Sequence, residues 1–279
     1  MPEFLSAHDR DAATASTPPR RRAQRIFPLR FFVLELRRIG RDYTSMFFIA
    51  ILPAFLYVIF GAAQDYSDLP MGRGNVAMYV MIGMAAYGAV TATTGIGGQA
   101  AVERQQGWGR QLALTPLSDI AYVCVKTLVS AVIAIIPVAL IFLIGAWTSA
   151  SAPGWVWAAS GAVIVAGALM FALYGLAFGL AFRTESAVSA ASGSLVILGF
   201  LGNTFVVLSG TMLTVAKFTP LFGITALARW PLTDGAYAVM DRGPLPSDPL
   251  WVPLLNVTVW LIIFGVTCLI LVRRSRGRE

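Results

Sequence analysis

The residues "SASAPG", Ser149 to Gly154, interrupt a stretch of 56 residues, Thr127 to Phe182, that contains no Asp, Glu, Lys or Arg. A single helix over this stretch would be ~84 Å long at 1.5 Å per residue, whereas the hydrocarbon core of a bilayer is about 30 Å thick. Because Ser, Pro and Gly favour a turn, the quoted residues divide the stretch into two helices of membrane length. The chain is therefore predicted to cross a membrane more than once.

The rest of the chain has the same character. Of its 279 residues, 57% are hydrophobic and 13% are charged, about half the charged fraction of a soluble domain. Long uninterrupted apolar runs exclude the alternating strands of a β-barrel. The sequence predicts an all-α polytopic membrane protein, since a spanning helix needs about 20 apolar residues. Its six transmembrane helices are predicted at residues 44–63, 76–100, 120–148, 155–182, 188–210 and 250–272.

The basic residues predict the orientation of these helices. All but four of the 21 lie near the two termini or in the second and fourth connections between spans. Basic residues favour the cytoplasmic side, so both termini are predicted to be cytoplasmic, in a multi-pass protein of the bacterial plasma (inner) membrane. Residues 1–25 are predicted to be a disordered leader and residues 273–279 a basic tail. The net charge of +7 then reflects topology, and no nucleic-acid partner is predicted. The four exceptions are Arg73, Lys217, Arg229 and Arg242.

Residues 26–43 are predicted to form an amphipathic helix in the cytoplasmic interface of the bilayer. Phe32, Val33, Leu36 and Ile39 share one side of such a helix, and arginines lie on the other. A simple polybasic anchor for the first span is the alternative. Lys126 lies only a few residues into the third span, from where its side chain is expected to reach back to the cytoplasmic surface.

The sequence lacks the residues that several kinds of catalytic, metal-binding and ATP-binding site require. His8 is the only His, so neither a His-based zinc site nor Ser-His or Cys-His catalysis is predicted within the spans. Neither Lys follows a Gly, which excludes a phosphate-binding loop for ATP. No catalytic residue, metal site or cofactor is therefore expected in this chain, and the centres of the predicted spans carry no ionisable residue. Energy for transport would come from elsewhere.

The connection between the second and third spans reads "ERQQGWGRQLALTPLSD", Glu103 to Asp119. The predicted topology makes it cytoplasmic, yet Trp108, Leu112 and Leu114 are too apolar for a plain solvated loop. A short helix after the Gly-Trp-Gly residues could press these side chains against a partner protein, or fold back on its own bundle. Pro116 is expected to end that helix.

This connection is similar to a segment of type-2 ABC transporter permeases, E-R-E-x-G-T-L-E-x-L-L-x-T-P-x-S. Matching positions are Glu103, Arg104, Gly107, Leu112, Thr115, Pro116 and Ser118, and the chain departs from the pattern at Gln105, Trp108, Gly109 and Arg110. The resemblance implies a cytoplasmic coupling helix that docks on a separate ABC ATPase subunit, present in two copies, which binds ATP and Mg²⁺. The residues assigned to this coupling are Glu103, Arg104, Gly107, Trp108, Leu112, Leu114, Thr115 and Pro116.

The resemblance also implies a second copy of this permease, or a homologous permease, with the pathway between the two. An uncharged pathway suits a hydrophobic or amphipathic small molecule, such as a drug, an antibiotic or a lipid. Gly175 and Gly179 form a small-xxx-small pair that can pack within the chain or across a homodimer. The residues assigned to the pathway are Thr91, Thr94, Asn203 and Met212.

The connection at residues 211–249 resembles the short outer helices of the same family between spans five and six. Its prolines argue against one continuous helix. Its apolar part, residues 212–228, either dips into the outer leaflet or packs over the bundle.

Two other functions remain open at this point. An unassisted transporter or channel could use backbone carbonyls in its pathway, although the predicted spans lack central charges. A membrane enzyme acting on lipids would have only Asp234, Asp241 and Asp248 as outer carboxylates.

Overall fold

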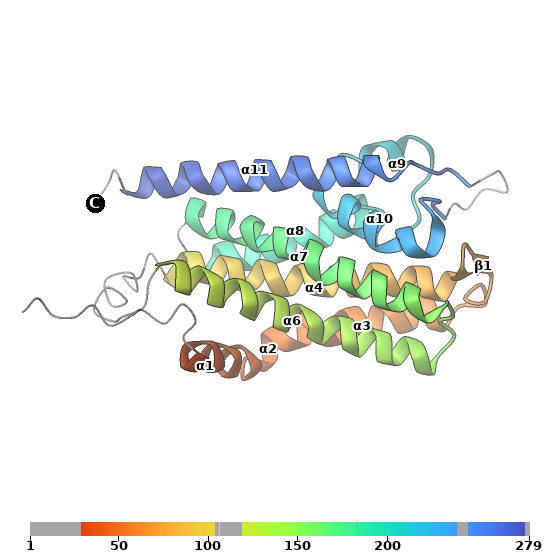
Figure 1. The fold of residues 1–279 in the computed structure, drawn as a ribbon, viewed down its shortest axis with the longest axis horizontal. Coiled ribbons are helices and arrows are strands. Elements are labelled where there is room, and N and C mark those ends of the chain that lie inside the picture. The colour runs from red at the N-terminus through yellow and green to blue at the C-terminus, as the bar shows by residue number, and fades with distance from the viewer. Residues whose placement is uncertain (1–28, 104–105, 107–118, 183, 239–244, 277–279) are drawn as a thin grey trace, which may run out of the picture.

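A computed structural model describes residues 29–103, 106, 119–182, 184–238 and 245–276. Its long helices lie side by side along one axis, and the one sheet among the described residues is a short hairpin (Figure 1). In chain order the elements are α1 (Leu29–Gly40), α2 (Tyr43–Met46), η1 (Phe47–Ile51), α3 (Leu52–Tyr57), η2 (Val58–Ala62), β1 (Pro70–Met71), β2 (Gly74–Asn75), α4 (Val76–Glu103), α6 (Asp119–Trp147), α7 (Gly154–Phe182), α8 (Glu185–Leu201), α9 (Gly210–Ala216), α10 (Pro220–Thr233) and α11 (Trp251–Arg276).

The two ends of the bundle differ. One, here the α1 end, holds α1, the end of α4, the start of α6 and the end of α11 (Figure 1). The other, the hairpin end, holds β1 and β2, which pair antiparallel with Pro70 opposite Asn75. The first described helix and the end of the last one therefore lie at the same end of the bundle, as the predicted topology requires. The leader, residues 1–25, and residues 277–279 of the tail lie outside the described residues.

Five helical segments among the described residues are long and apolar enough to cross a membrane: residues 43–62, 76–103, 122–147, 154–182 and 251–274. The turn predicted from "SASAPG" separates α6 from α7. The first segment is built from α2, η1, α3 and η2, so two of its turns are wide π-helical turns. This all-α, polytopic architecture is the predicted fold class.

The fifth predicted span takes a different form. Its helix, α8, begins at Glu185 and ends at Leu201, before the predicted end at residue 210. Asn203 has a left-handed backbone (φ 56°), which cannot continue a right-handed helix, and its side-chain oxygen accepts a hydrogen bond from the Leu208 amide. The next two helices, α9 and α10, are bent by 99° against each other, and they form either a broken sixth span or a re-entrant pair.

The core of the bundle is α4. In an apolar stretch of 18 residues within α4, 89% of the residues are buried, against 11% in the corresponding stretch of α11. The chain can bury α4 from all sides because this helix consists largely of Gly, Ala, Thr and Met. Small residues allow neighbouring backbones to approach closely, and the Thr93 hydroxyl donates a hydrogen bond to the Ala168 carbonyl of α7 at 2.6 Å.

The small-xxx-small pair on α7 packs within the chain. A Cβ atom on Gly175 would collide with the carbonyl oxygen of Thr94, and one on Gly179 would lie 2.6 Å from the Cβ of Ala101. Both neighbours belong to α4. Of the two arrangements open from sequence, the structure therefore shows packing inside one copy, which leaves these glycines unavailable to a second copy.

Gly175→Ala is expected to lower the thermal midpoint of the detergent-purified protein, since one added methyl group forces α4 and α7 apart at a cost of about 1–3 kcal/mol. Gly265→Ala is the matched control, because Gly265 lies in a helix and, apart from its two chain neighbours and the backbone of its own helix, no atom of the described residues comes within 4 Å of the position that its methyl group would take. The control should be neutral or slightly stabilised by the better helix propensity of Ala. Equal midpoints for the two variants would contradict the packing described for Gly175.

Candidate functional site

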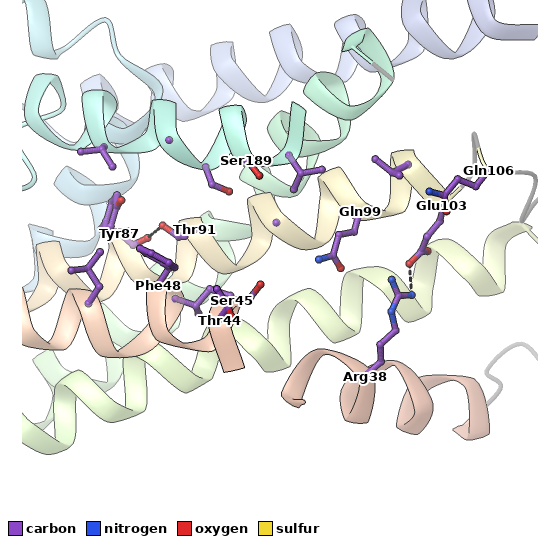
Figure 2. Close-up of a pocket in the computed structure, with 18 residues that line it drawn as sticks. Arg38, Thr44, Ser45, Phe48, Tyr87, Thr91, Gln99, Glu103, Gln106 and Ser189 are labelled. Carbon is purple, nitrogen blue, oxygen red and sulfur yellow. Dashed lines mark hydrogen bonds and ion pairs between the residues drawn. The ribbon is translucent and has the colours of Figure 1, made fainter. Parts of the chain in front are cut away.

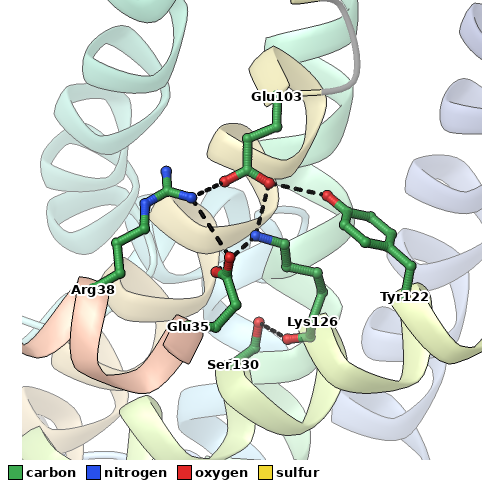
Figure 3. Close-up of polar contacts among 6 residues, drawn as sticks. All are labelled: Glu35, Arg38, Glu103, Tyr122, Lys126 and Ser130. Carbon is green, nitrogen blue, oxygen red and sulfur yellow. Dashed lines mark hydrogen bonds and ion pairs between the residues drawn. The ribbon is translucent and has the colours of Figure 1, made fainter. Parts of the chain in front are cut away.

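Four charged side chains and one tyrosine form a closed network at the α1 end (Figure 3). Glu103 is at its centre: one carboxylate oxygen accepts a hydrogen bond from Arg38 at 2.5 Å, and the other lies 2.8 Å from the Lys126 ammonium. The Tyr122 hydroxyl donates to that second oxygen at 3.0 Å. Lys126 also donates to Glu35 at 2.9 Å. These five residues are called the ion network below.

The ion network joins three segments that are distant in the sequence. Glu35 and Arg38 come from α1, where their spacing of three residues places them on one side of the helix. Glu103 is the last residue of α4, and Tyr122 and Lys126 are one turn apart near the start of α6. The Phe31 ring of α1 stacks on the Tyr122 ring with centroids 6.0 Å apart. Apolar and polar contacts therefore fix α1 to the same two helices.

Burial makes the pairing of these charges important. Glu103 is 6% exposed and Lys126 is 8% exposed, so an unpaired charge at either position would carry a large desolvation cost. The network balances two carboxylates with two cations. Burial alone would lower the pKa of Arg38, but the hydrogen bond and charge of Glu103, with the charge of Glu35, raise it above its ordinary value. The guanidinium therefore stays charged.

A cavity with a volume of about 740 Å³ begins beside the network and runs along α4 (Figure 2). It is partly open, and its other walls are the start of the first span and the face of α8 between Val188 and Val196. Five residues of α4 line it at every fourth position, a spacing that puts them on one side of a helix. They are Tyr87, Thr91, Gly95, Gln99 and Glu103.

The lining of the cavity mixes polar and apolar groups. Hydroxyl and amide side chains alternate with Phe48, Tyr87 and aliphatic residues, and among the described lining residues only Arg38 and Glu103, at one end, are charged. Such a surface can accept an amphipathic molecule, because apolar groups supply most of the contact area and a few polar groups orient the ligand. The polar side chains are Thr44, Ser45, Thr91, Gln99, Gln106, Ser189 and Ser192.

A family model for "ABC-2 family transporter protein" matches residues 65–274 of the chain. The chain belongs to the ABC-2 transporter family. It is also 26% identical over 239 residues to "Putative transport permease YvfS" of Bacillus subtilis (strain 168), a match that covers 83% of this chain and 91% of that protein. This ABC-2 chain is thus a multi-pass membrane transport permease, and family membership implies an ABC ATPase as its partner in general.

The four residues assigned to the pathway lie in different places in this ABC-2 permease. Thr91 lines the cavity. Thr94 is buried against α7, and its hydroxyl donates to the Phe171 carbonyl at 3.4 Å. Asn203 is buried in the turn after α8, and Met212 is 60% exposed on α9. The structure therefore brings only the first of the four to the cavity.

Of the residues assigned to ATPase coupling, the structure describes Glu103 alone. The other seven, between Arg104 and Pro116, lie outside the described residues. Glu103 was expected to contact the ATPase, but in the single chain both of its carboxylate oxygens are bound by α1 and α6. Lys126 was expected to reach the aqueous surface, and that expectation is wrong, because its ammonium lies buried between Glu35 and Glu103.

Sequence reasoning missed Glu35 and Tyr122. A signal for the first was present: Glu35 is the only acid between Asp11 and Asp42, and it falls between Phe32 and Ile39 on the apolar side of the helix. A carboxylate on that side needs a cationic partner. Tyr122 had no comparable signal, since a tyrosine near the end of a span is ordinary. Among the described residues, no group of three or more His, Cys, Asp or Glu could hold a metal ion.

Proposed function

We propose that this chain is the permease subunit of an ATP-driven exporter of hydrophobic or amphipathic molecules, such as drugs, antibiotics or lipids. Two copies of a separate ABC ATPase subunit bind ATP and Mg²⁺ and drive it, and this chain is not itself catalytic. The observation that carries the proposal is the ion network, because it joins the end of α4 to the start of α6, the two places where the connection from Glu103 to Asp119 begins and ends. That connection is the part of the chain that resembles a coupling helix.

The ion network allows a movement of this connection to be transmitted to the helices beside it. α4 ends at Glu103 and α6 begins at Asp119, so a force on the connection reaches both helices. Glu103 is tied to Lys126 of α6 and to Arg38 of α1 by contacts of 2.8 and 2.5 Å. Closure of the ATPase would then move α1, α4 and α6 together, and it would move the wall of the cavity with them.

The cavity supports a second copy of the permease. Several of its polar side chains, among them Thr44 and Gln99, lie on helices of membrane length, where lipid chains cannot supply hydrogen-bond partners. A second copy, identical or homologous, covers this side and turns two such cavities into one polar-lined pathway. The described lining carries no charge between Tyr87 and Gln99, which suits an uncharged or amphipathic molecule.

The proposed location is the bacterial inner membrane, with the α1 end in the cytoplasm. Basic residues are concentrated at this end, on α1 and at the end of α11, as the positive-inside rule requires. The hairpin end carries Arg73 and Lys217, and both are engaged in ion pairs, with Asp234 and Asp248 respectively.

These ion pairs also bear on the proposal of a lipid enzyme. Asp234 contacts Arg73 at 2.5 Å, and Asp248 contacts Lys217 at 2.7 Å and accepts a hydrogen bond from Tyr237. Both carboxylates thus have structural partners, while Asp241 lies outside the described residues. An unassisted transporter or channel remains the alternative to be tested.

Affinity purification from native membranes in mild detergent tests the class directly. We expect an ABC ATPase to copurify in an amount equal to the permease, and the complex to hydrolyse ATP faster with substrate present. Vesicles containing the complex should accumulate substrate only with ATP on the ATPase side. A chain that purifies alone after crosslinking, and that carries substrate or ions without ATP, would replace the exporter by the channel alternative.

A further inference from the structure

Arg229, in the middle of α10, is a buried cation without a carboxylate partner among the described residues. It is 4% exposed, and within the described part of the chain no Asp or Glu lies at ion-pair distance from it. Its guanidinium donates instead to three backbone carbonyls, those of Tyr79 at 3.1 Å, Asn203 at 2.7 Å and Thr204 at 3.3 Å. The exporter function proposed above makes no use of this residue.

Arg229 supplies hydrogen-bond donors to the backbone carbonyls of Asn203 and Thr204. They follow directly on the end of α8, where carbonyls have no amide partner further along a helix. At 17 residues, α8 is ~25 Å long, shorter than the hydrocarbon core of about 30 Å. Asn203 and Thr204 are each 3% exposed, so water does not replace the missing amides. Arg229 satisfies two of these carbonyls from another helix, and its positive charge suits the negative end of the α8 dipole.

Neighbouring residues of α4 contact the Arg229 guanidinium and leave space for it. Its carbon lies 3.8 Å from the centroid of the Tyr79 ring, a cation–π contact. Gly83 provides the space: a Cβ atom there would collide with a guanidinium nitrogen and lie 2.9 Å from the Thr204 carbonyl. The Thr204 hydroxyl also shares a hydrogen bond with the Thr225 hydroxyl of α10 at 3.1 Å. Thus α4, the end of α8 and α10 meet at one point.

The residue after Thr204, Phe205, contacts a residue that lines the cavity. The Phe205 ring packs edge-on against the Tyr87 ring with centroids 4.6 Å apart, and Tyr87 lines the cavity at the hairpin end. Gly199 of α8 gives Phe205 room, because a Cβ atom there would lie 2.5 Å from the ring. Arg229 therefore holds the backbone next to a side chain that packs on Tyr87, the lining residue at this end of the cavity.

We infer that Arg229 is a positioning residue for transport: by binding the carbonyls of Asn203 and Thr204 it keeps Phe205 on Tyr87 and the cavity closed toward the hairpin end. Release of substrate on that side requires these hydrogen bonds to break or to move with α10. The inference rests on the proposed function in one respect, namely that the cavity is the transport pathway.

Thiol labelling tests this closure without any transport assay. In a Cys124→Ala/Cys268→Ala background, Thr91→Cys places a reporter in the cavity, and Asp68→Cys, at an exposed position before the hairpin, reports the hairpin side. A membrane-impermeant cationic methanethiosulfonate is added from the hairpin side. We expect Asp68→Cys to react in every variant, and Thr91→Cys to react about tenfold faster with Arg229→Met, a factor that corresponds to ~1.4 kcal/mol.

Two further variants keep the test decisive if Arg229→Met does not fold. Gly83→Ala retains the charge but displaces the guanidinium, so it should also speed labelling of Thr91→Cys. Arg229→Lys keeps one donor near the carbonyls and should give an intermediate rate, while the control Gly265→Ala should change nothing. Unchanged labelling of Thr91→Cys in Gly83→Ala, with Asp68→Cys fully reactive, would overturn the inference.

Transport measurements separate this inference from the proposed function. Faster labelling together with altered export supports both. Faster labelling with normal export would retain the closure by Arg229 but overturn the role of the cavity as the pathway. Lost export with unchanged labelling would assign Arg229 to stability alone.

Discussion

Glu103→Gln is expected to abolish ATP-driven transport and to destabilise the permease by about 3–5 kcal/mol, the cost typical of removing one partner from a buried ion pair. The substitution keeps the size of the side chain and removes the charge that Arg38 and Lys126 share. Lys126 is left with Glu35 alone, and α4 loses its charged tie to α1. Thermal unfolding in detergent measures the loss of stability, and substrate-stimulated ATP hydrolysis measures the loss of coupling.

A second substitution distinguishes coupling from stability. In Glu103→Gln/Lys126→Met, the cation left without Glu103 is also removed, so part of the lost stability should return. Coupling should stay lost, because the double variant removes the ion pair that joins α4 to α6 at this point. Arg37→Gln is the control on α1, since Arg37 is exposed and is not part of the ion network. If the double variant regained transport together with stability, the network would be structural only.

Gly95→Trp is expected to block transport while leaving the protein folded and bound to its ATPase. Gly95 lines the cavity on α4, and apart from its two chain neighbours and the backbone of its own helix no atom of the described residues lies within 4 Å of the position that a Cβ would take. A large ring therefore enters open space and fills the cavity between Thr91 and Gln99. Export should fall by at least about tenfold, and ATP hydrolysis should lose its dependence on substrate.

Gly265→Trp provides the comparison for this variant. Gly265 is also inside a helix with free space around it in the described part of the chain, but α11 is the most exposed of the candidate spans, and the residue does not line the cavity. A ring there points away from the pathway and should leave export unchanged. Equal export by both tryptophan variants would show that substrate does not pass through the cavity.

The membrane helices could be predicted from the sequence because the bilayer requires each spanning segment to be apolar along its own length. A run such as Thr127 to Phe182 is readable from composition alone, and the turn at "SASAPG" follows from local backbone preferences. The coarse architecture could therefore be predicted from composition, whereas the ABC-2 family was predicted from the resemblance of the connection between Glu103 and Asp119. The coupling role of that connection stays a prediction, since only Glu103 of its assigned residues is described.

The end of α8, the partners of Lys126 and the environment of Arg229 depend instead on tertiary contacts. Residues 188–210 contain no charged residue, so composition favours one long helix, and only the left-handed Asn203 and its carbonyl contacts explain the early end. Lys126 looked free to reach water because Glu35 is 91 residues away in the chain. Arg229 was placed only in the connection at residues 211–249 for the same reason, since its partners Tyr79 and Asn203 are remote in sequence.

The almost complete burial of α4 has a consequence for biogenesis. Of the five candidate spans, α4 is the least hydrophobic, because its threonines and glycines are made to face protein. When the ribosome delivers it to the insertion machinery, α7 and α10, which cover those faces, have not yet been synthesised. We expect the nascent helix to wait at the edge of the translocon until α6, the most hydrophobic of the five, follows and draws it into lipid.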